Sequence, residues 1–132
     1  MQGERPSGDK IEPFRLKNEI ENMIKYGRPL TLNFSRKDRD LAIEIRETML
    51  RMYKLSIELE KKYYRKTTAQ ELDVELESLR HFIRMASDKD YFGTKYSPPP
   101  STHQYETWAR YNRTIGNMLG AYIKSLAAKS KE

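Results

Sequence analysis

Hydrophobic residues recur every three or four positions along most of this chain, with charged residues between them. The longest regular series runs from Leu41 to Tyr63 and keeps this spacing for about six helical turns. Such spacing places the apolar side chains on one face of a helix, and that face needs a partner to cover it. The pattern predicts four amphipathic helices, over residues 14–34, 36–65, 68–88 and 102–128.

Helix-breaking residues mark both ends of the first predicted helix. Residues 1–12 are rich in glycine, proline and charge, so we expect this N-terminal segment to be disordered. Gly27 and Pro29 lie near the other end, where a proline removes a helical hydrogen bond and its ring clashes with the preceding turn. We therefore expect the first helix to be kinked or split near Pro29, and Ser35 to cap the second helix.

Capping residues also mark the starts of the third and fourth predicted helices. A Thr-x-x-Glu capping box begins at Thr68. The segment 89–100 contains aromatic residues and three consecutive prolines, so we expect it to be a loop. After these prolines, Ser101 or Thr102 can cap the fourth helix, with the side chain of Gln104 reaching back to the chain before it.

The fourth predicted helix carries large aromatic residues and two glycines one turn apart. Each glycine costs about 1 kcal/mol relative to alanine in a helix interior, so the pair predicts a neighbouring backbone pressed close. That neighbour is either another helix of the same chain or a second subunit, and both alternatives fit the sequence. The residues assigned to this packing or oligomer surface are Tyr105, Trp108, Gly116, Gly120 and Tyr122.

The length and composition fit one all-α domain. A chain of 132 residues is the size of a single domain, and its four helices predict an antiparallel up-down four-helix bundle over residues 13–132. Only 37% of the residues are hydrophobic, which suits long exposed helices or helices that share their apolar faces between subunits. Together with the paired glycines and the aromatic residues, this predicts a closed, ring-like homo-oligomer.

The charge and the missing residue types narrow the class of partner. The net charge of +6 predicts an acidic partner, either nucleic acid or an anionic protein surface. No apolar run has the length of a membrane span and no hydrophobic signal region stands at the start, so we expect a cytoplasmic protein that does not bind membranes. The absence of cysteine excludes disulfides and thiolate metal sites.

The sequence contains little that could perform catalysis. Its two histidines, His81 and His103, each have a glutamate about one turn away, but this pairing does not repeat in the form that a di-iron bundle requires. The glycines are scattered rather than gathered into a phosphate-binding loop. We therefore expect no enzyme activity, no catalytic residue, no metal and no cofactor.

Basic residues give the most positive functional signal. Arg80 and Arg84 lie one turn apart, so both are predicted to project from the same side of the third helix and to grip neighbouring phosphates. Acidic residues alternate with basic ones, so the positive charge is patchy. No aromatic platform for stacking bases is evident in the sequence, which predicts binding with little preference for particular bases. The candidate contacts to nucleic acid or to a protein partner are Arg36, Lys37, Lys61, Lys62, Arg65, Lys66, Arg80, Arg84, Arg110, Arg113 and Lys124.

Three segments resemble the accessory variability determinant (Avd) proteins of diversity-generating retroelements, and the wider ribosomal-RNA intervening-sequence protein family. The first segment, IENMIKYGRPLTLNFSRK, begins at Ile20 and is similar to a first helix that is interrupted at Pro29 and closed by an Arg-Lys pair. The second segment, LRHFIRMA, begins at Leu79 and is similar to the third helix of the family. The sequence departs from the family pattern at Pro100 and Thr102, where the family tends to have Thr-Pro rather than Pro-Ser-Thr, and at Asn112. The matching residues of the fourth helix are Thr102, His103, Gln104, Glu106, Gly116, Gly120 and Ile123.

This resemblance implies a non-catalytic partner of a retroelement reverse transcriptase. Avd proteins are similar bundles that assemble as pentameric barrels, associate with the reverse transcriptase through charge complementarity and bind nucleic acid. With the enzyme and template-repeat RNA, they support the adenine-mutagenic cDNA synthesis that diversifies a target gene. The implied partners are thus the reverse transcriptase, RNA and DNA, and further copies of the chain.

The alternative is an intervening-sequence-type bundle that acts as a structural or interaction oligomer without a reverse transcriptase. The two groups share a fold. The excess of lysine and arginine favours the Avd interpretation, because a bundle that only associates with itself does not need it.

Overall fold

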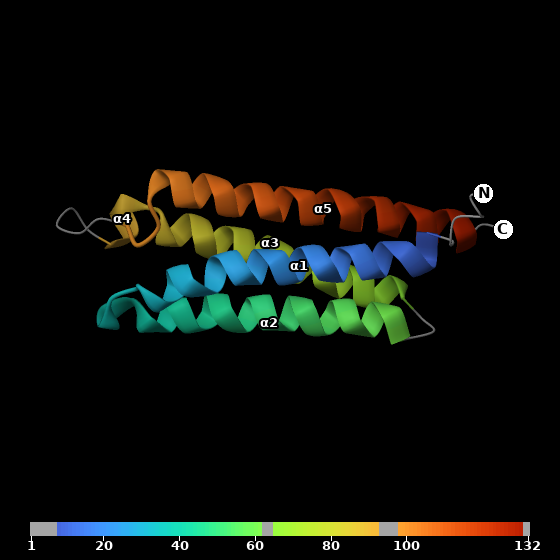
Figure 1. Cartoon of the computed structure of the whole chain (residues 1–132), viewed down its shortest axis with the longest axis horizontal. Helices are drawn as coiled ribbons and strands as arrows, with labels where there is room; N and C mark the ends of the chain where they lie inside the picture. The colour runs from blue at the N-terminus through green and yellow to red at the C-terminus, as the bar shows by residue number, and fades with distance from the viewer. Residues whose placement is uncertain (1–7, 62–64, 93–97, 131–132) are drawn as a thin grey trace.

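A computed structural model describes residues 8–61, 65–92 and 98–130 of the protein, and every regular element in these ranges is helical (Figure 1). The predicted all-α class is therefore confirmed for the described residues. Two short helices join the long ones. The long helices are α1 (Gly8–Leu32), α2 (Arg39–Lys61), α3 (Lys66–Ala86) and α5 (Thr102–Ser130), and the short ones are the 3₁₀ helix η1 (Arg36–Asp38) and α4 (Lys89–Phe92).

The four long helices run alternately up and down in one bundle (Figure 1). Helices α1 and α3 each pack against both α2 and α5, so the four form a closed square of contacts. The helices η1 and α4 lie at one end of the bundle, and the end of α2 and the start of α3 lie at the other (Figure 1). The predicted antiparallel four-helix arrangement is confirmed, while the ring-like oligomer stays a prediction.

The core is built from the apolar stripes that define the helices. Each fully buried Leu, Ile or Met side chain contributes about 1.5–3 kcal/mol through its removal from water. The two largest fully buried side chains, Trp108 and Tyr122, both come from α5. The other members of the core are Leu16, Ile20, Met23, Leu41, Ile45, Met49, Met52, Leu59, Ala69, Leu72, Leu76, Leu79, Ile83, Ala86, Ile115 and Leu119.

Gly27 gives α1 room for the largest of these side chains. A Cβ atom at this position would lie 2.5 Å from Cζ2 of Trp108, which is much closer than atoms pack. The indole Nε1–H of Trp108 donates to Sδ of Met23, one turn earlier on α1, at 3.3 Å. Gly27 therefore serves the contact between α1 and α5, a role that the sequence alone did not indicate.

Helix α1 starts earlier than predicted and is unbroken near its end. Residues 8–12 are helical rather than disordered, because no glycine or proline follows Gly8 within them. The helix also continues through Pro29, so the expected split is wrong, and the kink stays a prediction. Thr31 is buried beyond this proline and accepts a hydrogen bond from Nη1 of Arg46 at 3.0 Å, which holds the last turn against α2.

The predicted capping box at the start of the third helix is wrong. Helix α3 begins at Lys66 with Arg65 in the N-cap position, and no side chain caps it. Thr68 lies inside the first turn and is buried together with Ala69, so packing against the core sets its place. Arg65 belongs to the start of α3 rather than to α2, which ends at Lys61.

Local hydrogen bonds shape the connection between α3 and α5. The predicted capping box of the fourth helix is confirmed: Oγ of Ser101 accepts from the backbone N–H of Gln104 at 3.1 Å, and Oε1 of Gln104 accepts from that of Ser101 at 2.9 Å. The expected loop at 89–100 is wrong in its first part, which forms α4. Oδ1 of Asp88 accepts from the backbone N–H of Asp90 at 2.8 Å and so caps this single turn.

Candidate nucleic-acid interface

Two of the candidate basic contacts lie in η1, between α1 and α2. Arg36 and Lys37 are exposed there. Ser35 stands at the predicted cap position, but its hydroxyl donates to Oδ2 of Asp38 at 2.8 Å instead of accepting from a backbone N–H. This junction is at the same end of the bundle as α4 (Figure 1).

A second basic group lies at the opposite end of the bundle. Lys61 and Lys66 are exposed and Arg65 is half-buried, whereas Lys62 lies outside the described residues. Helix α2 has 23 residues, so about 35 Å separates the two junctions. The two groups therefore cannot contact the same short segment of nucleic acid from a single chain.

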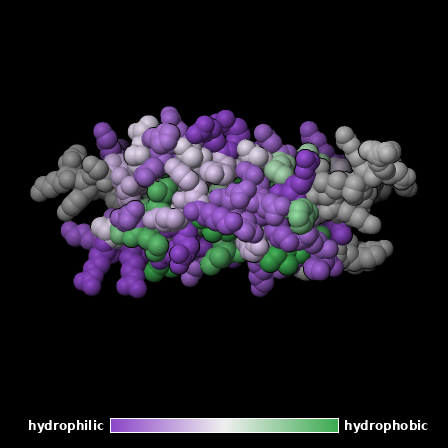
Figure 2. Space-filling model, in the orientation of Figure 1, coloured by the Kyte–Doolittle hydropathy of each residue, from purple (hydrophilic) through white to green (hydrophobic). Residues whose placement is uncertain are grey.

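Helix α5 exposes Arg110, Arg113 and Lys124 along its length. Nη2 of Arg110 donates to Oγ1 of Thr107 within the same helix at 3.2 Å. Hydrophilic side chains cover most of the face in Figure 2, and smaller hydrophobic groups lie along its lower half, where α1 and α2 run. The candidate cations are thus spread over both ends and two helices rather than gathered in one stripe.

Arg80 joins α3 to α5 instead of projecting freely from α3. Its Nη2 donates to the backbone carbonyl of Asn112 at 3.1 Å, and its Nη1 donates to Oε1 of Glu77 at 3.3 Å. A Cβ at Gly116 would lie 2.5 Å from this Nη2. The guanidinium fills the space left by the glycine, so the neighbour of Gly116 is a side chain and not the backbone that the sequence predicted.

Arg84 differs from Arg80 in its surroundings. It is exposed, and within the described part of the chain its side chain has no ion pair and no hydrogen bond. Both arginines line a groove of about 280 Å³ between α3 and α5. The structure therefore brings the predicted pair together, but leaves only Arg84 unengaged for a partner.

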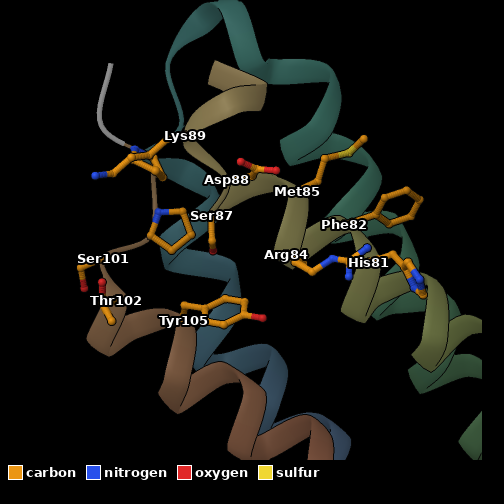
Figure 3. A pocket seen from close by; sticks show the side chains of 12 residues that line it. His81, Phe82, Arg84, Met85, Ser87, Asp88, Lys89, Ser101, Thr102 and Tyr105 are labelled. Atoms are coloured by element: carbon orange, nitrogen blue, oxygen red, sulfur yellow. The ribbon is translucent and has the colours of Figure 1, made fainter. Parts of the chain in front are cut away.

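A larger cavity, of about 800 Å³, lies where the end of α3, α4 and the start of α5 meet, and we call it the end cavity. Arg84, Lys89, Pro98 and Tyr105 are among its walls. Figure 3 shows Tyr105 reaching from α5 toward α3, with Arg84 on the α3 side. This cavity was not predicted from the sequence, because residues 89–100 were expected to be a loop; the prolines of that segment were the available signal, since Pro98 and Pro100 line the cavity.

The residues assigned to a packing or oligomer surface divide into two groups. Trp108 and Tyr122 are fully buried in the core of their own chain, so neither ring is surplus for a contact between subunits. Tyr105 is half-buried beside the end cavity. No atom lies within 4 Å of a Cβ placed at Gly120, so the prediction of a close neighbour there is wrong within the described chain.

Charged and polar side chains also connect α1 to α2. Nζ of Lys17 lies 2.6 Å from Oε1 of Glu60, and this hydrogen bond raises the pKa of Lys17 above its usual range. The hydroxyl of Tyr53 donates to Oε1 of Glu21 at 3.1 Å. Hydrogen bonds from Tyr53 and from Lys25 lower the pKa of Glu21. These pairs hold the two helices together on a different side of the bundle from the α3–α5 groove.

The described part of the chain lacks two kinds of feature. In residues 8–61, 65–92 and 98–130, no three histidine, aspartate or glutamate side chains are grouped so that they could hold a metal ion. None of the described helices is long and apolar enough to cross a membrane.

The fold and surface define a small, basic, all-α bundle with exposed cations on several sides. The model of the bAvd-like protein family matches residues 14–126, which span parts of all four long helices. The chain therefore belongs to the bAvd-like family, and the resemblance to Avd proteins is confirmed. No curated protein matches the chain.

Proposed function

We propose that this protein is a non-catalytic accessory factor of a diversity-generating retroelement. In this role it binds the retroelement reverse transcriptase and nucleic acid, including template-repeat RNA and cDNA, and supports mutagenic cDNA synthesis and retrohoming. The observation that carries the proposal is the bAvd-like family match over residues 14–126. The net charge of +6 supports it, because RNA and an acidic polymerase surface are both attracted to an excess of cations.

Contacts to phosphates would come first from the end of the bundle that carries η1 and α4. Arg36, Lys37 and Arg84 are exposed cations toward this end. Each duplex phosphate that they neutralise contributes about −0.9 to the slope of log affinity against log salt. Arg80 would act indirectly, by holding α3 against α5, because its guanidinium already has two hydrogen-bond partners.

The proposed assembly is a ring-like homo-oligomer, with five subunits as in the Avd barrels. A ring repeats each cationic group around its axis and turns weak contacts into strong binding. Gly120 supports a close approach by a second subunit, because the space beside its Cα is open and a glycine inside a helix costs about 1 kcal/mol relative to alanine.

The test is co-purification with the reverse transcriptase encoded beside this protein, followed by a cDNA assay on template-repeat RNA. We expect the Arg36→Glu/Arg84→Glu variant to lose the complex and the cDNA product. The matched control is Arg15→Glu/Lys54→Glu, which makes the same charge change at exposed positions of α1 and α2 away from this end and should retain both. A wild-type protein that neither binds the enzyme nor affects cDNA yield would rule the proposed function out.

A further inference from the structure

We propose that the end cavity binds one unpaired nucleotide, with its base against Tyr105 and its phosphate at Arg84 and Lys89. This inference rests on the proposed function, because it describes how a nucleic-acid strand would meet the bundle. It adds a contact to a base, which attraction between phosphates and exposed cations does not provide. The nucleotide can come from a single strand or be free in solution, and the experiment below separates these sources.

The size and position of the end cavity suit a ligand of this kind. Its volume of about 800 Å³ lies within the usual range of small-molecule pockets, which is about 300–1,000 Å³. It opens at the surface, because Arg84, Lys89 and Thr102 on its walls are all exposed. A single nucleotide can enter such a space, whereas the paired and stacked bases of a duplex cannot.

The walls of the cavity provide a surface for a planar base. Tyr105 is half-buried and points from α5 toward α3 (Figure 3). Phe82 and Met85 of α3 contribute further carbon surface, as do Pro98 and Pro100 before α5. Unpaired bases stack on aromatic side chains with little regard to base identity, because every base has a flat π face. Such a wall therefore fits an unpaired base better than the flexible side chains of an acidic peptide.

The charges on the walls favour a phosphate. Neither Arg84 nor Lys89 has an ion pair with another described residue. The acidic side chain on the walls, Asp88, already accepts a hydrogen bond from the backbone N–H of Asp90. Figure 3 places Lys89 at the upper edge, Tyr105 at the lower edge and Arg84 on the α3 side between them. In this view the amine of Lys89 points to the left and the guanidinium of Arg84 to the right, so both flexible side chains have to turn into the cavity to meet one phosphate.

The groove between α3 and α5 extends this site along the bundle. It shares His81, Arg84 and Tyr105 with the end cavity and runs on to Arg80 and Asn112. Within the described chain, Oδ1 of Asn112 has no hydrogen-bond partner although the residue is only 1% exposed. A strand with one nucleotide in the end cavity can therefore continue along this groove, where Arg80, already bonded to Glu77, holds the two walls together.

The first experiment compares Tyr105→Leu with Tyr105→Phe, which keeps the ring. Binding to a short labelled single-stranded RNA and to a hairpin duplex is measured by fluorescence anisotropy, after circular dichroism has shown that both variants are folded. Loss of base stacking should weaken binding of the single strand by Tyr105→Leu about 5- to 100-fold. Binding of the duplex should stay near the wild-type value, and Tyr105→Phe should bind both RNAs like the wild type.

The second experiment keeps the inference testable if Tyr105→Leu fails to fold. It compares Lys89→Gln with Lys54→Gln, which makes the same charge change at an exposed position of α2. We expect Lys89→Gln to weaken binding of the single strand more than Lys54→Gln does. Adenosine monophosphate should compete with the labelled strand better than adenosine, because Arg84 and Lys89 then have a phosphate to contact.

The outcomes separate this inference from the proposed function. If Tyr105→Leu matches Tyr105→Phe, or Lys89→Gln matches Lys54→Gln, the inference is overturned, while salt-dependent duplex binding and the reverse-transcriptase complex leave the function standing. Displacement of the strand by an acidic peptide but not by adenosine monophosphate also overturns it, and assigns the cavity to a protein. Binding of adenosine monophosphate that leaves strand affinity unchanged supports a site for free nucleotides. A wild type that binds neither RNA removes both proposals.

Discussion

Replacing Gly27 by Ala tests how tightly α1 packs against α5. The new Cβ would lie 2.5 Å from Cζ2, 2.6 Å from Cε2 and 2.9 Å from Nε1 of Trp108. Carbon atoms in contact normally stay about 3.5–4.0 Å apart, so the indole and the backbone of α1 would have to separate by about 1 Å. Trp108 is fully buried, so its ring cannot turn into solvent, and its contact with Met23 would be disturbed.

Two effects of opposite sign set the size of the change. Overfilling a packed core costs about 1–3 kcal/mol. Alanine is more favourable than glycine in a helix interior by about 1 kcal/mol, which offsets part of this cost. Because three ring atoms are too close at once, we expect the strain to dominate and the free energy of unfolding to fall by about 1–2 kcal/mol. For a chain of this size the melting temperature should drop by about 4–8 °C.

The intrinsic fluorescence of the protein reports on this contact directly, because Trp108 is its single tryptophan. Unfolding in urea is followed by fluorescence and by far-UV circular dichroism. The wild type and Gly27→Ala are measured at the same protein concentration, since association makes apparent stability depend on concentration. We expect a lower midpoint for Gly27→Ala with an unchanged slope.

Gly120→Ala is the matched control, because the described chain leaves the space beside Gly120 open. At a protein concentration too low for subunits to associate, it should gain up to about 1 kcal/mol from helix propensity alone. If Gly27→Ala gains the same amount, the indole does not occupy the space beside Gly27 and the reasoning is refuted. A loss in Gly120→Ala would instead show that a second subunit packs against this position.

Three further measurements test contacts at Gly116, Glu21 and Gly120. Gly116→Ala should change the free energy of unfolding in urea by less than about 1 kcal/mol, because the end of the Arg80 side chain can move aside; a larger loss would mean that it cannot. The hydrogen bond from Tyr53 holds the pKa of Glu21 below its ordinary value of 4.5 in the folded state, so the stability measured by thermal melts should fall as the pH drops below 4.5. Tyr53→Phe should lose less stability over the same pH range than the wild type, and an equal loss would contradict this. Gly120→Leu should lower the mass measured by light scattering without loss of helix content, and an unchanged mass would place the subunit contact elsewhere.

Helical periodicity was sufficient to locate the long helices and most of the core. Residues of the predicted stripes, such as Ile45, Leu72 and Leu119, are fully buried, because a repeat of 3.6 residues fixes which side chains share a face. A capping box, with its two residues three positions apart, was sufficient to predict the start of the fourth helix at Ser101. The same pattern at Thr68 gave a wrong prediction, because burial of the first turn of α3 against other helices outweighs a local cap.

The roles of the two arginines on α3 could not be predicted from their spacing. Arg80 and Arg84 are equivalent in a helical pattern. They differ in the structure because Gly116 leaves space for one guanidinium and the carbonyl of Asn112, 32 residues from Arg80, accepts its hydrogen bond. The end cavity was unpredictable for the same reason, since Tyr105 and Arg84 come from different helices.

The contact between α1 and α5 also affects how a newly made chain folds. Met23 and Trp108 are 85 residues apart in the sequence, so their contact closes a loop that contains most of the chain. Contacts of such long separation form late, because the entropy of loop closure must be overcome first. Helix α5 also leaves the ribosome after the other three long helices, so the face of α1 that it covers stays exposed until then. The speed with which α5 docks therefore sets how long a nascent chain is open to aggregation.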